Sequence, residues 1–198
     1  MRAVGFDLDG TLLHYTRDYR DLLADAMGDV IGSAPSDALD GYEEAFFDRF
    51  QPLEPNPVQR AFQEALPEAE ADALADALLR REIEATEPPA GAAADLERLG
   101  ERYRLGVLTN GLPEWQRAKL GAHGLADVFD TFVASYEAGA HKPAVEPFQL
   151  FEERLLAERY AMVGDDSADV DGAAAAGWAA YRYDGSGFGG LPEAIDWP

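Results

Sequence analysis

The sequence predicts an α/β fold, a doubly wound parallel sheet that carries an inserted α-helical subdomain. A short apolar run at residues 3–6 indicates a buried strand, and from about residue 90 onward helical and strand-like patterns alternate. Such alternation is typical of a parallel sheet with helices on both faces. Between these regions, residues 14–89 carry helical patterns and no clear strand. We therefore expect 1–13 and 90–198 to form one core, with 14–89 as a helical insertion.

The insertion at 14–89 is predicted to be helical because its apolar residues recur at helical spacing. Three such faces occur in it: Tyr19, Leu22, Leu23, Ala26 and Val30; Tyr42, Ala45, Phe46 and Phe50; and Leu74 and Leu78. Pro52, Pro55 and Pro57 break the region in the middle, and a proline pair at 88–89 closes it. We expect the aromatic residues of this region to form its own core.

After the insertion, the pattern predicts short helices and strands in turn. Helices are expected at about 92–101 and 113–123, around Phe148, Phe151 and Leu155, and in the alanine-rich stretch after residue 163, with strands at 105–108, 131–134, 160–163 and about 178–183. Pro113 suits the start of its helix, where a missing N–H costs nothing. The tail from Asp184 is rich in glycine and proline and is expected to be irregular.

The composition of the chain is strongly acidic. Its 38 Asp and Glu residues against 16 Lys and Arg give a formal charge of -22. Nucleic acids and anionic membranes bind basic surfaces, so both are excluded as partners. The absence of cysteine excludes disulfides, thiolate metal sites and a cysteine nucleophile. Since no secretory signal or membrane span is apparent, a cytoplasmic location is expected.

The acidic residues are spread along the chain and form no tail, which indicates a solvated surface. An acidic, lysine-poor and alanine-rich composition is typical of proteins from salt-accumulating halophiles, where salt screens self-repulsion. Lysine occurs only twice, at Lys119 and Lys142. Such scarcity indicates a specific reason for each of the two.

Polar residues whose side chains can bind a ligand or take part in catalysis follow three of the predicted strands. Asp7 and Asp9 follow the first, residues 109–111 follow the second, and residues 164–167 follow a later one. Ligands of open parallel sheets bind beyond the carboxyl ends of the strands, so we expect these groups to converge on one crevice. Lys142, which lies ahead of a helix, can balance the carboxylates and hold an anionic substrate.

Asp7 and Asp9 leave the tip of a core strand together, one residue apart. Two like charges this close repel each other, and the arrangement persists only if something offsets the repulsion. A divalent cation such as Mg2+ does so, because it takes oxygen ligands. The sequence therefore predicts Mg2+ as a cofactor.

The ordered set of motifs resembles that of the haloacid dehalogenase-like hydrolase superfamily, on its phosphatase side. The motifs are Asp7-x-Asp9-Gly10-Thr11, then Thr109-Asn110-Gly111, then Lys142-Pro143, then Gly164-Asp165-Asp166 with Asp169. The resemblance covers residues 1–13 and about 90–183. It implies a Rossmann-like core, with a helical cap at 14–89 that covers the site.

The resemblance also implies a mechanism. Asp7 would be the nucleophile that forms an aspartyl-phosphate, and Asp9 would protonate the leaving oxygen and then activate water. Mg2+ would be held by the Asp7 carboxylate, the Asp9 main-chain carbonyl and Asp165. The Thr109 hydroxyl and the Asn110 amide would bind phosphoryl oxygens.

The remaining motif residues would support this chemistry. Lys142 would stabilise Asp7 and the transition state, and Asp169 would orient Lys142 or a metal-bound water. Gly10, Thr11, Gly111 and Asp166 complete the motifs. Among Asp165, Asp166 and Asp169, the order along the chain favours Asp165 as the metal ligand, because it comes first after the strand.

Each motif also has a structural interpretation. Asp9-Gly10 suits a turn, residues 109–111 suit a helix-capping turn before Pro113, and Lys142 can be a surface lysine near a helix start. Asp166 suits a negatively charged first helical turn. These interpretations explain single motifs but not the ordered set of four.

The sequence favours a Mg2+-dependent phosphatase acting on a small phosphorylated metabolite, of the sugar phosphate, phosphoglycolate or nucleoside monophosphate type. An inserted cap suits small substrates, because a lid excludes water and bulky partners. A 2-haloacid dehalogenase lacks an acid at the position of Asp9, and a phosphomutase shares every catalytic residue. A non-catalytic phospho-receiver domain places its phosphorylated Asp after a middle strand and carries no cap.

Overall fold

The computed structural model describes residues 1–197 as two compact units. The first, here the sheet unit, joins Met1–His14 to the chain from Glu87 onward. The second, here the helical unit, is Tyr15–Thr86, where the sequence predicts an insertion at 14–89. The helical unit thus lies in the sequence between the two segments of the sheet unit.

A five-stranded parallel sheet forms the centre of the sheet unit, with the strand order β5-β4-β1-β6-β7. Its strands are β1 (Arg2–Phe6), β4 (Arg104–Thr109), β5 (Thr131–Ala134), β6 (Arg159–Gly164) and β7 (Ala179–Arg182). The N-terminal strand thus occupies the middle of the sheet. The doubly wound α/β fold that the sequence predicts is confirmed.

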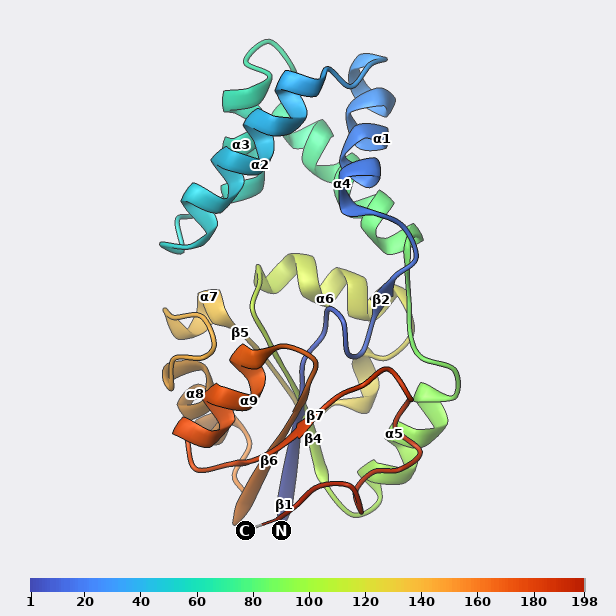
Figure 1. The fold of residues 1–198 in the computed structure, drawn as a ribbon, viewed down its shortest axis with the longest axis vertical. Coiled ribbons are helices and arrows are strands. Elements are labelled where there is room, and N and C mark those ends of the chain that lie inside the picture. Colours follow the sequence, from blue (N-terminus) through green and yellow to red (C-terminus); the bar gives the residue numbers. More distant parts are fainter. Residues whose placement is uncertain (198) are drawn as a thin grey trace. The chain divides into compact units, whose positions relative to one another are not determined.

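Helices cover both faces of this sheet, as Figure 1 shows. One face packs on α5 (Ala92–Gly100) and α6 (Pro113–Ala122), and the other packs on α8 (Glu146–Arg154) and α9 (Ser167–Ala175). A 3-10 turn, Ala126–Val128, and the short helix α7 (Ser135–Ala138) complete the connections. Alternate residues of each strand enter opposite cores, since successive strand side chains point to opposite faces.

The register of the sheet places the end of β1 beside the ends of its two neighbours. Phe6 pairs with Val107 of β4 and with Val163 of β6. The backbone N–H of Asp7 then donates to the carbonyl of Val163 over 2.9 Å. The residues that follow β1, β4 and β6 therefore leave the sheet at one edge, where ligands of such sheets bind.

The helical unit consists of four helices, α1 (Tyr19–Ile31), α2 (Ser36–Phe50), α3 (Pro57–Ala65) and α4 (Ala71–Glu84). Helix α1 packs on α4, and α2 packs on α3. The predicted apolar faces supply the core, with Leu22, Leu23, Tyr42, Leu74 and Leu78 fully buried. None of the described helices combines the length and the apolar character that a membrane span requires.

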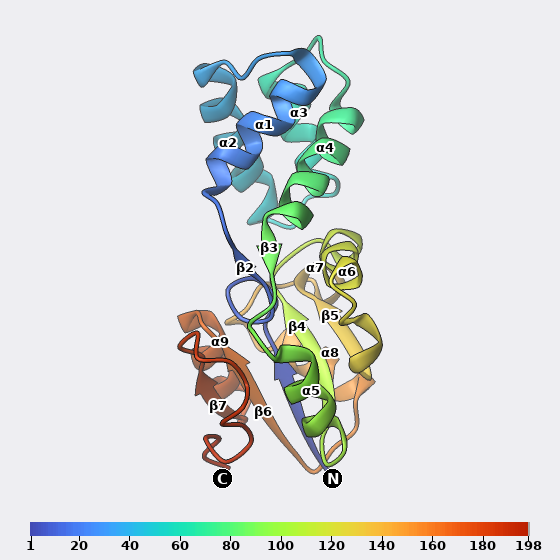
Figure 2. The same ribbon diagram turned by 90° about the vertical axis from the view of Figure 1, so that its right-hand side faces the viewer.

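Two features of the helical region differ from the sequence prediction. Pro57, expected only to break the region, opens α3, because proline suits the first turn of a helix. The region was also expected to lack strands, yet β2 (His14–Tyr15) pairs with β3 (Thr86–Glu87), as Figure 2 shows. Strands of two residues carry no readable periodicity, and their pairing depends on residues about 70 positions apart.

Candidate active site

The loop after β1 is fixed to the end of β6 through Gly10 and Thr11. Gly10 has a φ of +88°, and a Cβ atom there would lie 2.4 Å from the Asp165 carboxylate. Only glycine fits this conformation and this close approach. The Thr11 hydroxyl donates to Asp165 Oδ1 over 2.8 Å. Both residues thus bring Asp165 up to the loop that carries Asp7 and Asp9.

Lys142 lies buried between two carboxylates. Its ammonium donates to Asp7 Oδ1 over 2.7 Å, to Asp169 Oδ1 over 2.5 Å and to the carbonyl oxygen of Leu108 over 2.8 Å. An ammonium has three N–H groups, so all of them are used. Lys142 therefore ties the end of β4 to Asp7 and Asp169 and supplies a fixed positive charge beside the Asp7 carboxylate.

The electrostatics of this cluster leave a surplus of negative charge. Burial raises the pKa of Asp7 to about 7, against the lowering effect of Lys142, and Asp169 raises it further. Burial by itself would lower the pKa of Lys142, but Asp7 and Asp169 outweigh it and raise that pKa. Lys142 therefore stays charged, and Asp7 is the group whose pKa rises, because its burial outweighs the attraction of Lys142 and the Asp169 carboxylate adds to the rise.

The second motif joins the end of β4 to the segment that carries Lys142. The Asn110 side chain accepts from the Lys142 N–H over 2.8 Å and donates to the Lys142 carbonyl over 3.1 Å. This pair of bonds fixes the Lys142 backbone and uses one of the two amide hydrogens of Asn110. Thr109 is buried, and its Oγ1 accepts a hydrogen bond over 3.2 Å from the Gln116 amide. The hydroxyl hydrogen of Thr109 is not used in this bond and can be donated to another acceptor.

The last motif begins helix α9 with a capping box. The Asp166 carboxylate accepts from the Ala168 N–H over 2.8 Å, and Asp169 Oδ2 accepts from the Asp166 N–H over 3.1 Å. Gly164 is required here, because a Cβ atom at that position would lie 2.2 Å from Asp169 Oδ2. Asp166 thus caps the helix, as the structural interpretation of this motif predicts.

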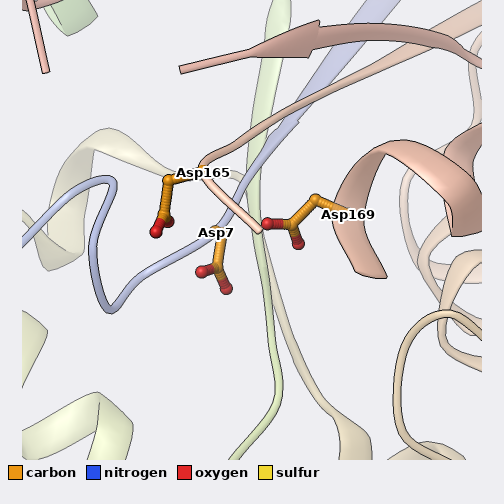
Figure 3. A group of neighbouring side chains, drawn as sticks. All are labelled: Asp7, Asp165 and Asp169. Atoms are coloured by element: carbon orange, nitrogen blue, oxygen red, sulfur yellow. The ribbon is translucent and has the colours of Figure 1, made fainter. Parts of the chain in front are cut away.

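Three carboxylates converge beyond the sheet edge. Oxygen atoms of Asp7, Asp165 and Asp169 lie within 4.8 Å of one another, and Figure 3 shows their side chains around a common space. Both oxygens of Asp169 already accept hydrogen bonds, from Lys142 and from the Asp166 N–H. In Asp7 and Asp165, by contrast, only Oδ1 accepts a hydrogen bond from a described residue. The geometry therefore favours Asp7 and Asp165 as metal ligands and Asp169 as the partner of Lys142.

A pocket of about 210 Å³ adjoins Asp7 and Asp169 of this group. It is lined by Asp7, Asp9, Thr109, Asn110, Lys142, Asp166, Ala168 and Asp169. The first, second, third and fourth motifs thus contribute to one pocket of the sheet unit.

The charges around the pocket fit a divalent cation. Among the described residues, the carboxylates of Asp7, Asp9, Asp165, Asp166 and Asp169 face two ammonium groups, those of Lys119 and Lys142. Formal negative charge is therefore in excess, and carboxylate oxygens are the ligands that Mg2+ prefers. Burial is the main cause of the raised pKa of Asp7, and the neighbouring carboxylates of Asp169 and Asp9 raise that pKa further.

Two residues of α6 belong to the site although the motif prediction left them out. The Lys119 ammonium contacts Asp9 Oδ1, and the Gln116 amide donates to Asp9 Oδ2 over 2.6 Å. The sequence signal was present for Lys119, because the chain has only two lysines and both lie buried here. Gln116 gave no such signal, because a single glutamine in a helix is ordinarily part of the solvated face.

Curated relatives of the chain are phosphatases. Over 130 residues, it is 39% identical to a phosphoserine phosphatase of Thermus thermophilus, a match that covers 60% of this chain and 51% of that protein. It is 30% identical over 183 residues to a phosphoglycolate phosphatase of Cereibacter sphaeroides, covering 89% of this chain and 82% of the relative. The match spans about half the length of several of the curated relatives.

The fold also matches solved structures. One is a HAD-hydrolase, YfnB of Bacillus subtilis, determined with bound magnesium, which superposes with a TM-score of 0.66 at 24% identity and covers 90% of this chain and 86% of its own. The model of the haloacid dehalogenase-like hydrolase family matches residues 1–177, which is most of the chain. The four motifs, the parallel sheet and this match agree, and the chain belongs to the haloacid dehalogenase-like hydrolases.

Proposed function

We propose that this protein is a Mg2+-dependent phosphatase that hydrolyses a small phosphorylated metabolite through an aspartyl-phosphate. The observation that carries the proposal is the placement of Asp7. Its carboxylate lies at the central strand end, bound to Lys142 over 2.7 Å, in a pocket that Asp9, Thr109 and Asn110 also line. The phosphatase names of the relatives support the same reaction.

In the first step, an oxygen of Asp7 attacks phosphorus, and the bond from phosphorus to the leaving oxygen breaks. Asp9 gives its proton to that oxygen, so the alcohol leaves neutral. The Thr109 hydroxyl and the second amide hydrogen of Asn110 bind phosphoryl oxygens. Lys142, whose three N–H groups are already used, contributes through its charge.

In the second step, water attacks the phosphorus of the aspartyl-phosphate. Asp9, now ionised, takes a proton from that water, and the bond between phosphorus and the Asp7 oxygen breaks. Phosphate leaves and the Asp7 carboxylate is restored. Both steps use the same two carboxylates, because the group that donates a proton in one step accepts it in the next.

Mg2+ would be held by the side chains of Asp7 and Asp165 and by the main-chain carbonyl of Asp9. Asp169 lies within reach of the same position but is held by Lys142. When bound, the ion offsets charge on the transferring phosphoryl group.

The helical unit, Tyr15–Thr86, is proposed to act as a cap that admits small substrates. An insertion between β1 and β4 follows directly on the residues of the first motif, so its connections begin close to Asp9 in the sequence. The names of the relatives, phosphoserine and phosphoglycolate phosphatase, point to substrates of the same small size. A phosphomutase would use the same carboxylates, and a substrate screen for released phosphate separates the two.

Removal of the metal is expected to stop the reaction. With excess EDTA, release of phosphate from p-nitrophenyl phosphate and from a panel of small phosphate esters should fall to background, and added Mg2+ should restore it. Mg2+ at about 100 times its Kd should also raise the Tm of the free protein by about 5–10 °C. The reason is that the cation offsets the surplus charge around Asp7 and Asp165.

The variant Asp165→Asn tests whether the Mg2+-dependent rise in Tm depends on the Asp165 carboxylate. It should lose most of the Mg2+-dependent rise in Tm, whereas Asp171→Asn, at an exposed position on α9, should keep it. Phosphate release that continues in EDTA, or release of halide from a 2-haloacid without metal, would contradict the proposed chemistry and favour the dehalogenase.

The acidic surface supports a second expectation, adaptation to salt. With a formal charge of -22, the folded chain repels itself, and salt screens that repulsion. Raising KCl from about 0.1 to 2 M should raise the Tm by about 5 °C or more, with activity retained, as followed by circular dichroism. A Tm that falls as KCl rises would show that the acidic surface is no adaptation to salt.

A further inference from the structure

Two residues of one helix contact the carboxylate of Asp9. Gln116 and Lys119 lie three positions apart on α6, which places them on the same helix face. The Gln116 amide donates to Asp9 Oδ2 over 2.6 Å, and the Lys119 ammonium contacts Asp9 Oδ1. Each oxygen of the Asp9 carboxylate therefore has its own donor, and the two contacts together fix the rotation of the carboxylate.

Burial shows that these two residues are not part of the solvated face of α6. The side chain of Lys119 is 1% exposed and Gln116 is 4% exposed, whereas the Asp9 side chain keeps 34% of its surface accessible. A fully buried lysine is rare unless it is paired, because removing an ammonium from water is costly. The arrangement thus places two buried donors behind one carboxylate that faces the pocket.

The orientation of the Gln116 amide follows from the same contact. Its nitrogen faces Asp9 and also donates to Thr109 Oγ1 over 3.2 Å, while its buried Oε1 accepts no hydrogen bond from a described residue. The reverse orientation would set an amide oxygen against a carboxylate. Gly111 leaves room for this side chain, because a Cβ atom there would lie 2.7 Å from Gln116 Nε2.

We propose that Gln116 and Lys119 are positioning residues that hold the Asp9 carboxyl group in the orientation required for proton transfer to the leaving oxygen. This inference rests on the proposed function. Neither residue lines the pocket, so both act through Asp9 and not on the substrate. Helix α6 thereby connects the first motif, through Asp9, with the second, through Thr109.

The dependence of rate on the leaving group provides the test. A poor leaving group, such as the alkoxide of an alkyl phosphate, needs the proton from Asp9, whereas p-nitrophenolate leaves readily without it. The quantity to compare is kcat/KM, which covers the steps up to formation of the aspartyl-phosphate. Wild type and the variants Lys119→Met, Gln116→Met and Asp9→Asn are assayed with Mg2+ on the best alkyl phosphate of the screen and on p-nitrophenyl phosphate.

Lys119→Met and Gln116→Met are expected to lower kcat/KM for the alkyl phosphate by about 100-fold and for p-nitrophenyl phosphate by less than about threefold. Asp9→Asn should show the same selectivity to a greater degree. Arg117→Met is the matched control, because it removes a cation from the same helix at a side chain that is 47% exposed and pairs with Glu137. It should leave both rates unchanged. The Mg2+-dependent rise in Tm should persist in all α6 variants.

The possible failures are distinguishable. If wild type hydrolyses neither ester, the proposed function and this inference fall together. If Asp9→Asn shows the selective loss but Lys119→Met and Gln116→Met lose equally on both esters, or not at all, the positioning role is wrong and the proposed function stands. If both α6 variants fail to fold, as seen by circular dichroism, the pair serves the stability of the sheet unit and the inference is overturned.

Discussion

Asp7→Asn is expected to lower kcat for p-nitrophenyl phosphate by at least about 10⁴-fold, to the limit of detection. The asparagine amide has the shape of the carboxylate but is no nucleophile, so the aspartyl-phosphate cannot form. Its oxygen can still accept the hydrogen bond from Lys142, which keeps the pocket in place. Steady-state kinetics in saturating Mg2+ measure the loss.

The stability of this variant separates a chemical effect from a structural one. Burial raises the pKa of Asp7 from 3.8 to about 7, so its contribution to stability is present at low pH and is lost as the pH rises through about 7. Asparagine is neutral at every pH, so the variant does not lose this stability as the pH rises. Metal-free Asp7→Asn should therefore be at least as stable as wild type at pH 8.

Asp171→Asn, at an exposed position, should retain activity. Retained turnover in Asp7→Asn would refute the nucleophile.

Lys142→Met should be the most destabilising single change in the site. Without the ammonium, Asp7 and Asp169 are left buried and facing each other, and breaking a buried ion pair by removing one partner costs about 3–5 kcal/mol. Urea unfolding in EDTA at pH 7.5 measures the free energy, because bound metal would replace part of the lost charge. Activity should also be lost, since the charge beside Asp7 is removed.

A double-mutant cycle with Asp7→Asn tests the cause. If the loss in Lys142→Met comes from uncompensated charge, Asp7→Asn should recover part of it, and the two changes together should cost less than their sum. Additive losses would show that the lysine acts through packing alone, and a loss below about 1 kcal/mol would show that it is not a buried partner of these carboxylates.

The differences between expectation and structure arise where a long-range contact decides. Helix α3 begins at Pro57, and strands β2 and β3 pair across the insertion, although neither has a local pattern strong enough to be read. The same holds for Asn110. Its residue type fits phosphate binding, but its amide also fastens the backbone of Lys142, which lies 32 residues away.

What the sequence determined by itself is the sheet, the helical insertion and the set of residues 7, 109 and 142 that line one pocket. A buried strand shows as an apolar run, and in a parallel sheet the residue after each run falls at a common edge, so local pattern and topology suffice. Only the tertiary structure decided how these groups are partnered. It showed that Asp169 pairs with Lys142 and that Lys119 and Gln116 contact Asp9, because the spacing of polar residues along a helix is the same whether they face water or a carboxylate of the site.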